Sequence, residues 1–207
     1  MTRAVVVTGT DTGVGKTVFA AGLAAALGGL YWKPVQAGID PVSDTDTAAF
    51  LGARVLPEVY SLTTPASPHL AARIDGVTIN PMRLALPQVD DYLVAEGAGG
   101  VLVPLSETLL YADVFATWGT PVILCARTGL GTINHSLLSI DALRARGVPV
   151  LGIVFIGEAH EENERIVPSL GKVLSLGRLP MLDPLTPEAL AEVFADTIDM
   201  AAIRAAL

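Results

Sequence analysis

Short apolar runs rich in β-branched residues alternate along the chain with longer helical stretches. The runs predict strands over residues 4–8, 30–35, 92–95, 121–126, 150–156 and 173–176. The stretches between and after them predict helices over residues 17–27, 45–53, 134–146 and 187–206. Strands that are almost continuously apolar, with helices between them, are typical of a parallel sheet covered on both faces. We therefore predict an α/β fold with a mostly parallel central sheet and helices on both faces.

The same pattern indicates one domain over residues 1–207. A chain of 207 residues suits a single α/β domain with a substantial core. The sequence contains no internal repeat, low-complexity tract or Ser/Gly-rich linker. The stretch 57–88 is rich in proline and turn residues, so its elements are not assigned from the pattern.

Composition narrows the class of protein. Hydrophobic residues make up 51% of the chain and charged residues 16%, which excludes a disordered protein. The net charge of −8 argues against binding to nucleic acid or an anionic membrane. The apolar block after Arg3 is too short for a signal peptide, and the single cysteine, Cys125, predicts a buried thiol in a reducing compartment. We expect a cytoplasmic protein with no nucleic-acid and no membrane partner.

A glycine-rich loop, GTDTGVGKT over residues 9–17, lies between the first predicted strand and the first helix. Free N–H groups and the helix dipole converge on an anion at such a turn. The Lys16 amine can reach between β- and γ-phosphates, and the Thr17 hydroxyl can bind Mg²⁺. The strict Walker pattern has four residues between its glycines, whereas five separate Gly9 from Gly15 here. The strand and helix on either side nevertheless favour a phosphate loop over a chance match, and predict a P-loop NTPase-type fold.

Two charged residues lie at the ends of other predicted strands. The carboxyl ends of parallel strands form one ligand crevice, so Lys33 should face the phosphate loop; the alternative is an ordinary surface lysine. Glu96 ends the strand 92–95 and opens the segment EGAGG, where an acid can bind Mg²⁺ directly or through water. A plain glycine-rich turn would explain less, because an acid beside phosphate is repelled unless a cation is present.

Two features have alternative interpretations. Asp46 is either a second metal ligand or a helix N-cap, and Asp44 is an equal candidate for that cap. Residues 128–135 form a second glycine-rich loop before a helix, suited to a carboxylate or phosphate, or a simple helix start capped by Asn134. His135 has no neighbouring metal-ligand partner, so neither a zinc site nor a catalytic role is expected of it.

Five segments, taken in order, resemble the motifs of the dethiobiotin synthetase family. They are residues 9–17, 33–36 (KPVQ), 67–69 (SPH), 96–100 (EGAGG) and 130–135 (LGTINH). The match covers about residues 4–157, and the family's phosphate loop also has five residues between its glycines. The resemblance implies an ATP-dependent ligation of CO₂ with 7,8-diaminopelargonic acid that releases ADP and phosphate.

The resemblance also implies roles for individual residues. Lys16 and Lys33 would neutralise charge on the γ-phosphate and on a substrate carbamate. The metal set would be Thr17, Asp46 and Glu96. Nucleotide contacts are expected from Gly13, Val14, Gly15, Lys16, Thr17, Val18, Asp46, Glu96, Gly97, Ala98 and Gly99. Contacts with the base are expected from Pro180, Met181 and Leu182, because of their position after the turn 177–179. Substrate contacts are expected from Thr12, Lys33, Ala37, Gly131, Thr132, Ile133 and Asn134. In the family the loop 131–134 comes from the neighbouring subunit, which implies a homodimer.

The chain departs from the family's pattern at three places. Ala37 stands where the family often has a serine or threonine that bonds the substrate, and Gly13 replaces a larger polar residue of some members. The asparagine that reads adenine in some members aligns near Ile156 and Gly157, which offer no side-chain amide. The choice among nucleoside triphosphates therefore stays open.

The main alternative is a switch ATPase of the Min/Par type, which shares the fold. Its phosphate loop carries an extra lysine at the position of Asp11, and the C-terminal helix here is acidic rather than basic. An amidating enzyme of the cobyrinic-acid group would need room for a glutaminase domain. A non-catalytic nucleotide-binding module would need no second lysine at a strand end.

Overall fold

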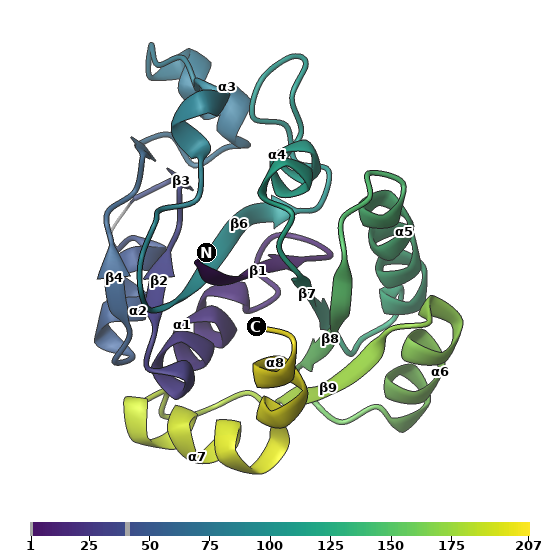
Figure 1. Cartoon of the computed structure of the whole chain (residues 1–207). Helices are drawn as coiled ribbons and strands as arrows, with labels where there is room; N and C mark the ends of the chain where they lie inside the picture. Colours follow the sequence, from purple (N-terminus) through teal and green to yellow (C-terminus); the bar gives the residue numbers. More distant parts are fainter. Residues whose placement is uncertain (1, 40–41) are drawn as a thin grey trace.

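The architecture is a central sheet whose strands all run parallel (Figure 1). The structure is a computed structural model that describes residues 2–39 and 42–207. The sheet has seven strands in the order β4-β2-β6-β1-β7-β8-β9. Along the chain these are β1 (Arg3–Gly9), β2 (Leu30–Trp32), β4 (Arg54–Leu56), β6 (Tyr92–Gly100), β7 (Val122–Arg127), β8 (Val150–Ile156) and β9 (Leu174–Leu179). A separate parallel pair is formed by β3 (Val35–Ala37) and β5 (Tyr60–Leu62). The predicted parallel sheet is confirmed.

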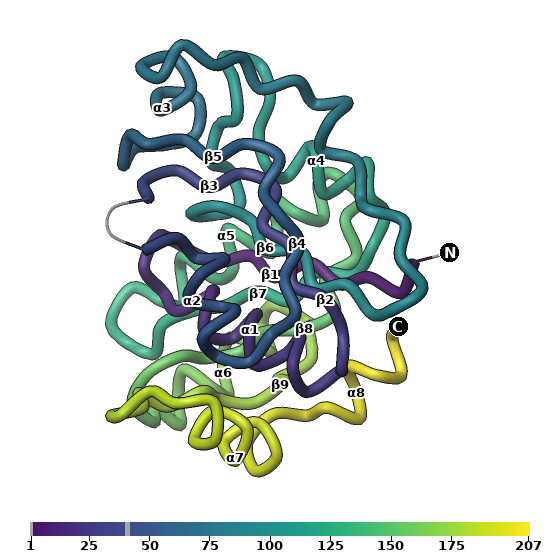
Figure 2. The backbone as a smooth tube through the Cα atoms, turned by 90° about the vertical axis from the view of Figure 1, so that its left-hand side faces the viewer, coloured from purple at the N-terminus to yellow at the C-terminus, as the bar shows by residue number. Residues whose placement is uncertain are grey.

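Helices cover both faces of this sheet. One face packs against α1 (Lys16–Leu27), α2 (Asp44–Phe50), α7 (Pro187–Thr197) and α8 (Met200–Ala205). The other packs against α4 (Tyr111–Trp118), α5 (Thr132–Arg144) and α6 (Glu161–Gly171). The short α3 (Pro68–Ile74) and a 3₁₀ turn, η1 (Pro81–Leu84), lie beyond them near β3 and β5. Figure 2 shows the main sheet between α7 on one side and α3 on the other.

Close packing fixes α1 between the sheet and α7. The rings of Phe19 and Phe194 stack with centroids 5.3 Å apart. A Cβ at Gly22 would lie 2.3 Å from the Phe194 ring, so only glycine lets the two helices approach this closely. The helix that begins at the phosphate loop, α1, is therefore held in place by its packing against α7.

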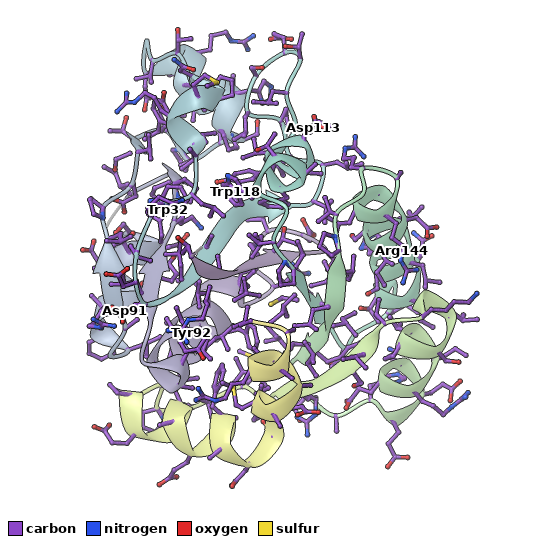
Figure 3. The ribbon with its side chains drawn as sticks, in the orientation of Figure 1. Trp32, Asp91, Tyr92, Asp113, Trp118 and Arg144 are labelled. Carbon is purple, nitrogen blue, oxygen red and sulfur yellow. The ribbon has the colours of Figure 1, made fainter. Side chains whose placement is uncertain are left out.

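The proline-rich stretch 57–88 is held to the rest of the fold near two tryptophans, Trp32 of β2 and Trp118 of α4. The rings of Trp32 and Trp118 lie 5.9 Å apart, and Figure 3 shows them on the same side of the sheet. The Trp118 indole N–H donates to the carbonyl of Leu84 at 2.7 Å. This bond ties the 3₁₀ turn to α4, and it supplies order that the sequence pattern of this stretch does not indicate.

Three predicted elements differ in extent from the structure. The strand predicted over 30–35 divides at Pro34, which has no N–H to continue the ladder and whose carbonyl instead accepts from Val59 and Tyr60. The helix predicted over 187–206 is two helices, because Asp199 donates its N–H to the carbonyl of Leu176 and caps α8 with its side chain. The strand predicted over 92–95 continues to residue 100. Within residues 2–39 and 42–207, no helix combines the length and the apolar character needed to cross a membrane.

Candidate active site

A cleft of about 770 Å³ opens at the carboxyl edge of the sheet. Its walls come from the phosphate loop, the segment after β2, the start of α2, residues 65–68 and the end of β6. Of the residues predicted to bind ligands, it is lined by Thr12, Gly13, Gly15, Lys16, Thr17, Val18, Lys33, Ala37, Glu96, Ala98 and Gly99. Residues separated widely in sequence thus meet where the strand order predicts a ligand crevice.

The phosphate loop has the geometry of an anion site. Gly15 occupies the N-cap of α1 with φ 97°, and no side chain of the described residues caps this helix. The first-turn N–H groups therefore remain available to an anion. A Cβ at Gly15 would lie 2.9 Å from Ile156, so both the backbone conformation and the space require glycine.

Glu96 is the centre of a charged cluster in the cleft, although its side chain is 0% exposed. Its Oε1 accepts from the Thr17 hydroxyl at 3.0 Å and from the Lys33 amine at 2.7 Å. Its Oε2 accepts from the Tyr31 hydroxyl at 2.8 Å. The Lys33 amine also lies 2.5 Å from Asp44 Oδ2, so one ammonium bridges two carboxylates. The predicted approach of Lys33 and Glu96 to the phosphate loop is confirmed by these contacts.

These contacts fix the charges of the cluster. Burial alone would lower the pKa of Lys33, but Glu96 and Asp44 outweigh it and raise that pKa, so the amine stays an ammonium. Burial would raise the pKa of Asp44, but Lys33 outweighs it and keeps that pKa low. The pKa of Lys16 is lowered by burial and further by the Lys33 charge, against the opposing pull of Glu96. Its amine donates to the Asp11 carbonyl at 2.8 Å.

Asp46 is not brought into this cluster, and the metal role predicted for it does not fit the geometry. Ser43 is the N-cap of α2, and Asp46 completes a capping box in which its carboxylate accepts from the Ser43 N–H and hydroxyl. Neither Asp46 nor Asp44 is the cap itself, so both cap assignments are wrong. Asp44, the first residue of α2, faces the cleft instead.

Oxygen ligands suited to Mg²⁺ converge in the cleft. Mg²⁺ in nucleotide sites uses one or two carboxylates together with phosphate oxygens and water. Thr17, Asp44 and Glu96 provide one hydroxyl and two carboxylates around the Lys33 amine. No group of three or more His, Cys, Asp or Glu side chains able to hold a metal occurs in the part of the chain that the structure describes. The residues present therefore fit a metal held jointly with phosphate, rather than one held by protein ligands alone.

Two predicted groups lie outside the cleft of their own chain. Residues 131–134 begin α5, with Gly131 at the N-cap at φ 91°, so Asn134 is not the cap. Residues 180–182 follow β9, and Met181 is 72% exposed. Val14 is buried in the core, and a Cβ at Gly97 would meet the Phe115 ring, so both positions also serve packing.

Sequence reasoning missed three contributors. The sequence suggests Asp44 only as a helix cap and indicates no role for Tyr31. The Gln36 side chain, 5% exposed, accepts from the Asp44 N–H at 3.3 Å and donates to the Gly38 carbonyl at 2.8 Å, which holds the start of α2 against the cleft. The signal available for Tyr31 was its spacing: it lies two residues before Lys33 and thus on the same face of an extended strand.

A phosphate loop between strand and helix, with two lysines and two acids at one edge of a parallel sheet, defines a P-loop nucleotide-binding protein. A family model described as an AAA domain matches residues 3–189. The chain is 61% identical to "ATP-dependent dethiobiotin synthetase BioD" of Rhodopseudomonas palustris (strain BisA53), over 97% of this chain and 96% of that protein. The chain therefore belongs to the family of ATP-dependent dethiobiotin synthetases. It is 62% identical to the protein of the same name from Nitrobacter hamburgensis, over 95% and 94%.

Solved structures with the same fold are more distant. A ParA family ATPase from Chlorobium tepidum TLS superposes with a TM-score of 0.58 at 11% identity, covering 99% of this chain and 97% of that one. The septum site-determining protein MinD of Pyrococcus horikoshii OT3, complexed with Mg-ADP, gives 0.56 at 19% identity, covering 93% and 86%. At these identities the likeness is one of fold alone. The Min/Par alternative therefore has support only at the level of the fold.

Proposed function

We propose that this chain closes the ureido ring of dethiobiotin from 7,8-diaminopelargonic acid, CO₂ and ATP, with Mg²⁺ as cofactor. The observation that carries the proposal is the position of Lys33, whose amine lies 2.7 Å from Glu96 in the cleft that the phosphate loop also lines. A module that only binds a nucleotide has no use for a second buried cation at that place.

The chemistry joins two anions, and the cleft lowers the cost of bringing them together. One substrate amine takes up CO₂ and loses a proton, which gives a carbamate. A carbamate oxygen attacks the γ-phosphorus and ADP leaves. The second amine then attacks the carbamate carbon, phosphate leaves and the ring closes. Lys16 and Lys33 oppose the negative charge that accumulates on the carbamate and the γ-phosphate.

Thr17, Asp44 and Glu96 are the residues that would hold Mg²⁺, and the metal supplies charge neutralisation at the β- and γ-phosphates. Asp44 replaces Asp46 in this set because it lines the cleft with Thr17 and Glu96, whereas the Asp46 carboxylate is held by Ser43 in the capping box. No histidine is among the residues that line the cleft in the described parts of the chain. Positioning and electrostatics, rather than a strong general base, therefore carry the reaction.

A homodimer completes the substrate site. A second groove of about 470 Å³ lies between the phosphate loop and α5. Leu138 and Leu102 in its wall are 60% and 49% exposed. An apolar patch of this kind is typical of a surface that another copy covers. Residues 131–134 lie beside it, so across a dimer they would meet the substrate carboxylate in the partner's cleft.

Two further parts of the proposal concern the nucleotide and the cell. Residues 180–182, which follow β9, line the base of the nucleotide. The chain accepts more than one nucleoside triphosphate, because Ile156 and Gly157 at the end of β8 offer no side-chain amide to read adenine. The net charge of −8 supports an enzyme of small molecules without a nucleic-acid or membrane partner. The single buried thiol, Cys125, supports a reducing compartment, the cytoplasm.

The test is phosphate release by the purified chain with Mg²⁺, bicarbonate and ATP, with and without 7,8-diaminopelargonic acid. We expect release only in the presence of the diamine, with dethiobiotin identified by mass spectrometry. GTP and CTP in place of ATP measure the choice of base. Phosphate release that is indifferent to the diamine would favour the switch ATPase instead.

A further inference from the structure

Tyr31 is a buried side chain to which the proposed chemistry assigns no role. Its exposed fraction is 0%, so it cannot touch substrate or nucleotide directly. Its hydroxyl donates to Glu96 Oε2 at 2.8 Å, and the hydrogen bond is itself buried. Any effect of Tyr31 on the reaction must therefore pass through Glu96.

The pairing of β2 with β6 places the Tyr31 hydroxyl next to the Glu96 carboxylate. In the parallel pair of β2 and β6, Tyr31 is the partner of Val94, so their side chains project from the same face. Glu96 follows Val94 by two positions and returns to that face. Tyr31 and Val94 belong to the same core cluster as Phe19 of α1. A ring packed in this way holds its hydroxyl at a fixed position.

The two oxygens of Glu96 consequently have different tasks. Oε1 meets the Thr17 hydroxyl and the Lys33 amine at the wall of the cleft, whereas Oε2 meets only the Tyr31 hydroxyl among the contacts of the described residues. The terminal torsion of a glutamate is broad, so without a partner for Oε2 the carboxylate plane is free to rotate. Groups that orient a ligand in this way influence metal affinity strongly.

We propose that Tyr31 is a positioning residue that holds Glu96 Oε1 toward Thr17 and thereby sets the affinity of the nucleotide complex for Mg²⁺. The proposal rests on the proposed role of Glu96 as a metal ligand. A merely structural role is the competing explanation, because a buried carboxylate oxygen needs a hydrogen-bond donor in any case. A structural role predicts a lower melting temperature with an unchanged Mg²⁺ affinity.

The experiment compares Tyr31→Phe with the native chain by calorimetric titration of ADP at a series of Mg²⁺ concentrations and in EDTA. The variant keeps the ring and removes the hydroxyl. We expect the Mg²⁺ midpoint to rise about tenfold, while the ADP affinity in EDTA stays at the native value. The electron paramagnetic resonance spectrum of Mn²⁺ in the ADP complex gives a second readout that needs no turnover. Both are recorded well below the melting temperature of each variant, measured first by circular dichroism.

Tyr111→Phe is the matched control. Tyr111 is also fully buried, and its hydroxyl makes no hydrogen bond to a side chain of the described residues. We expect Tyr111→Phe to leave the Mg²⁺ midpoint unchanged. Equal shifts in the two tyrosine variants, or no shift in Tyr31→Phe, would overturn the proposal.

A double-mutant cycle with Glu96→Gln separates this proposal from the proposed function. If Tyr31 acts through Glu96, Tyr31→Phe adds no further loss of Mg²⁺ affinity to Glu96→Gln. Additive losses overturn the positioning role. If Glu96→Gln itself leaves the Mg²⁺ midpoint unchanged, the metal assignment of Glu96 fails, and the Tyr31 proposal fails with it. If Glu96→Gln raises the midpoint and Tyr31→Phe does not, only the Tyr31 proposal is lost.

Discussion

Lys33 Nζ lies 2.5 Å from Asp44 Oδ2 and so ties the end of β2 to the first turn of α2. The side chain of Lys33 is 5% exposed and that of Asp44 35%, so the pair stands in the wall of the cleft rather than beneath it. The contact decides which acid of α2 belongs to the site. The contact also places the Asp44 carboxylate beside the Lys33 amine in the wall of the cleft, where a cation bound with the nucleotide would lie.

Asp44→Asn should therefore reduce turnover and Mg²⁺ affinity by about tenfold or more, because it removes a proposed metal ligand and one of two carboxylates that hold Lys33. Steady-state phosphate release over a Mg²⁺ series measures the effect. Asp46→Asn is the control: it weakens the capping box of α2 and should lower the melting temperature slightly with near-native turnover. The opposite ranking of the two variants would restore Asp46 as the metal ligand.

The choice between these two acids illustrates what the sequence leaves undecided. Asp44 and Asp46 are two positions apart, and on a helix they point in different directions. Which one reaches the cleft depends on where α2 begins, and that is set by the Ser43 cap and by the bond from the Asp44 N–H to Gln36. The Ser43-x-x-Asp46 spacing is a local signal for the start of α2, but Gln36 belongs to a separate segment, so the local pattern contains only part of this information.

The phosphate loop and the strand ends were predictable because their signals are local. An apolar strand, glycines and a lysine before a helix define the loop by themselves, and the parallel order brings Lys33 and Glu96 to one edge. The helix α6 does not follow from the pattern, although its acidic first turn favours a helix start, because Pro168 lies inside it and its apolar positions, such as Val167, are few. The course of residues 57–88 depends on tertiary contacts such as the Trp118 bond to Leu84.

Lys33→Gln should retain nucleotide binding and lose ring closure. The amide keeps a polar group of similar size but removes the charge that opposes the carbamate and γ-phosphate, so turnover should fall by about 10²–10³. Calorimetry with ADP checks binding, and dethiobiotin formation checks turnover. Lys172→Gln, at the exposed C-cap of α6, is the control and should be near native in both. Turnover that survives in Lys33→Gln would remove Lys33 from the mechanism.

The affinity for ATP should fall at alkaline pH because of Lys16. Its pKa lies below the ordinary 10.5, through burial and the neighbouring Lys33 charge. The unfolded chain keeps this proton to higher pH than the native chain, so the contribution of Lys16 to stability rises with pH between the lowered pKa and 10.5. A bound triphosphate favours the charged amine instead, so the dissociation constant of ATP should increase over that same window.

Calorimetric titration of ATP across an alkaline series measures this effect on Lys16. In Lys33→Gln one cause of the lowered pKa is absent, so the loss of ATP affinity should begin at higher pH than in the native chain. An identical pH dependence in the two proteins would mean that Lys33 does not act on Lys16.

Leu138→Asp should separate the proposed dimer. Leu138 is 60% exposed in the wall of the groove beside α5, and a charge there would have to be desolvated against the second copy. We expect light scattering to give a dimer for the native chain and a monomer for the variant. The KM for the diamine should rise, because residues 131–134 no longer reach the partner's cleft. Leu170→Asp, 57% exposed on α6, is the matched control and should remain a dimer with native turnover. A native chain that is monomeric and fully active would exclude a substrate site shared between two copies.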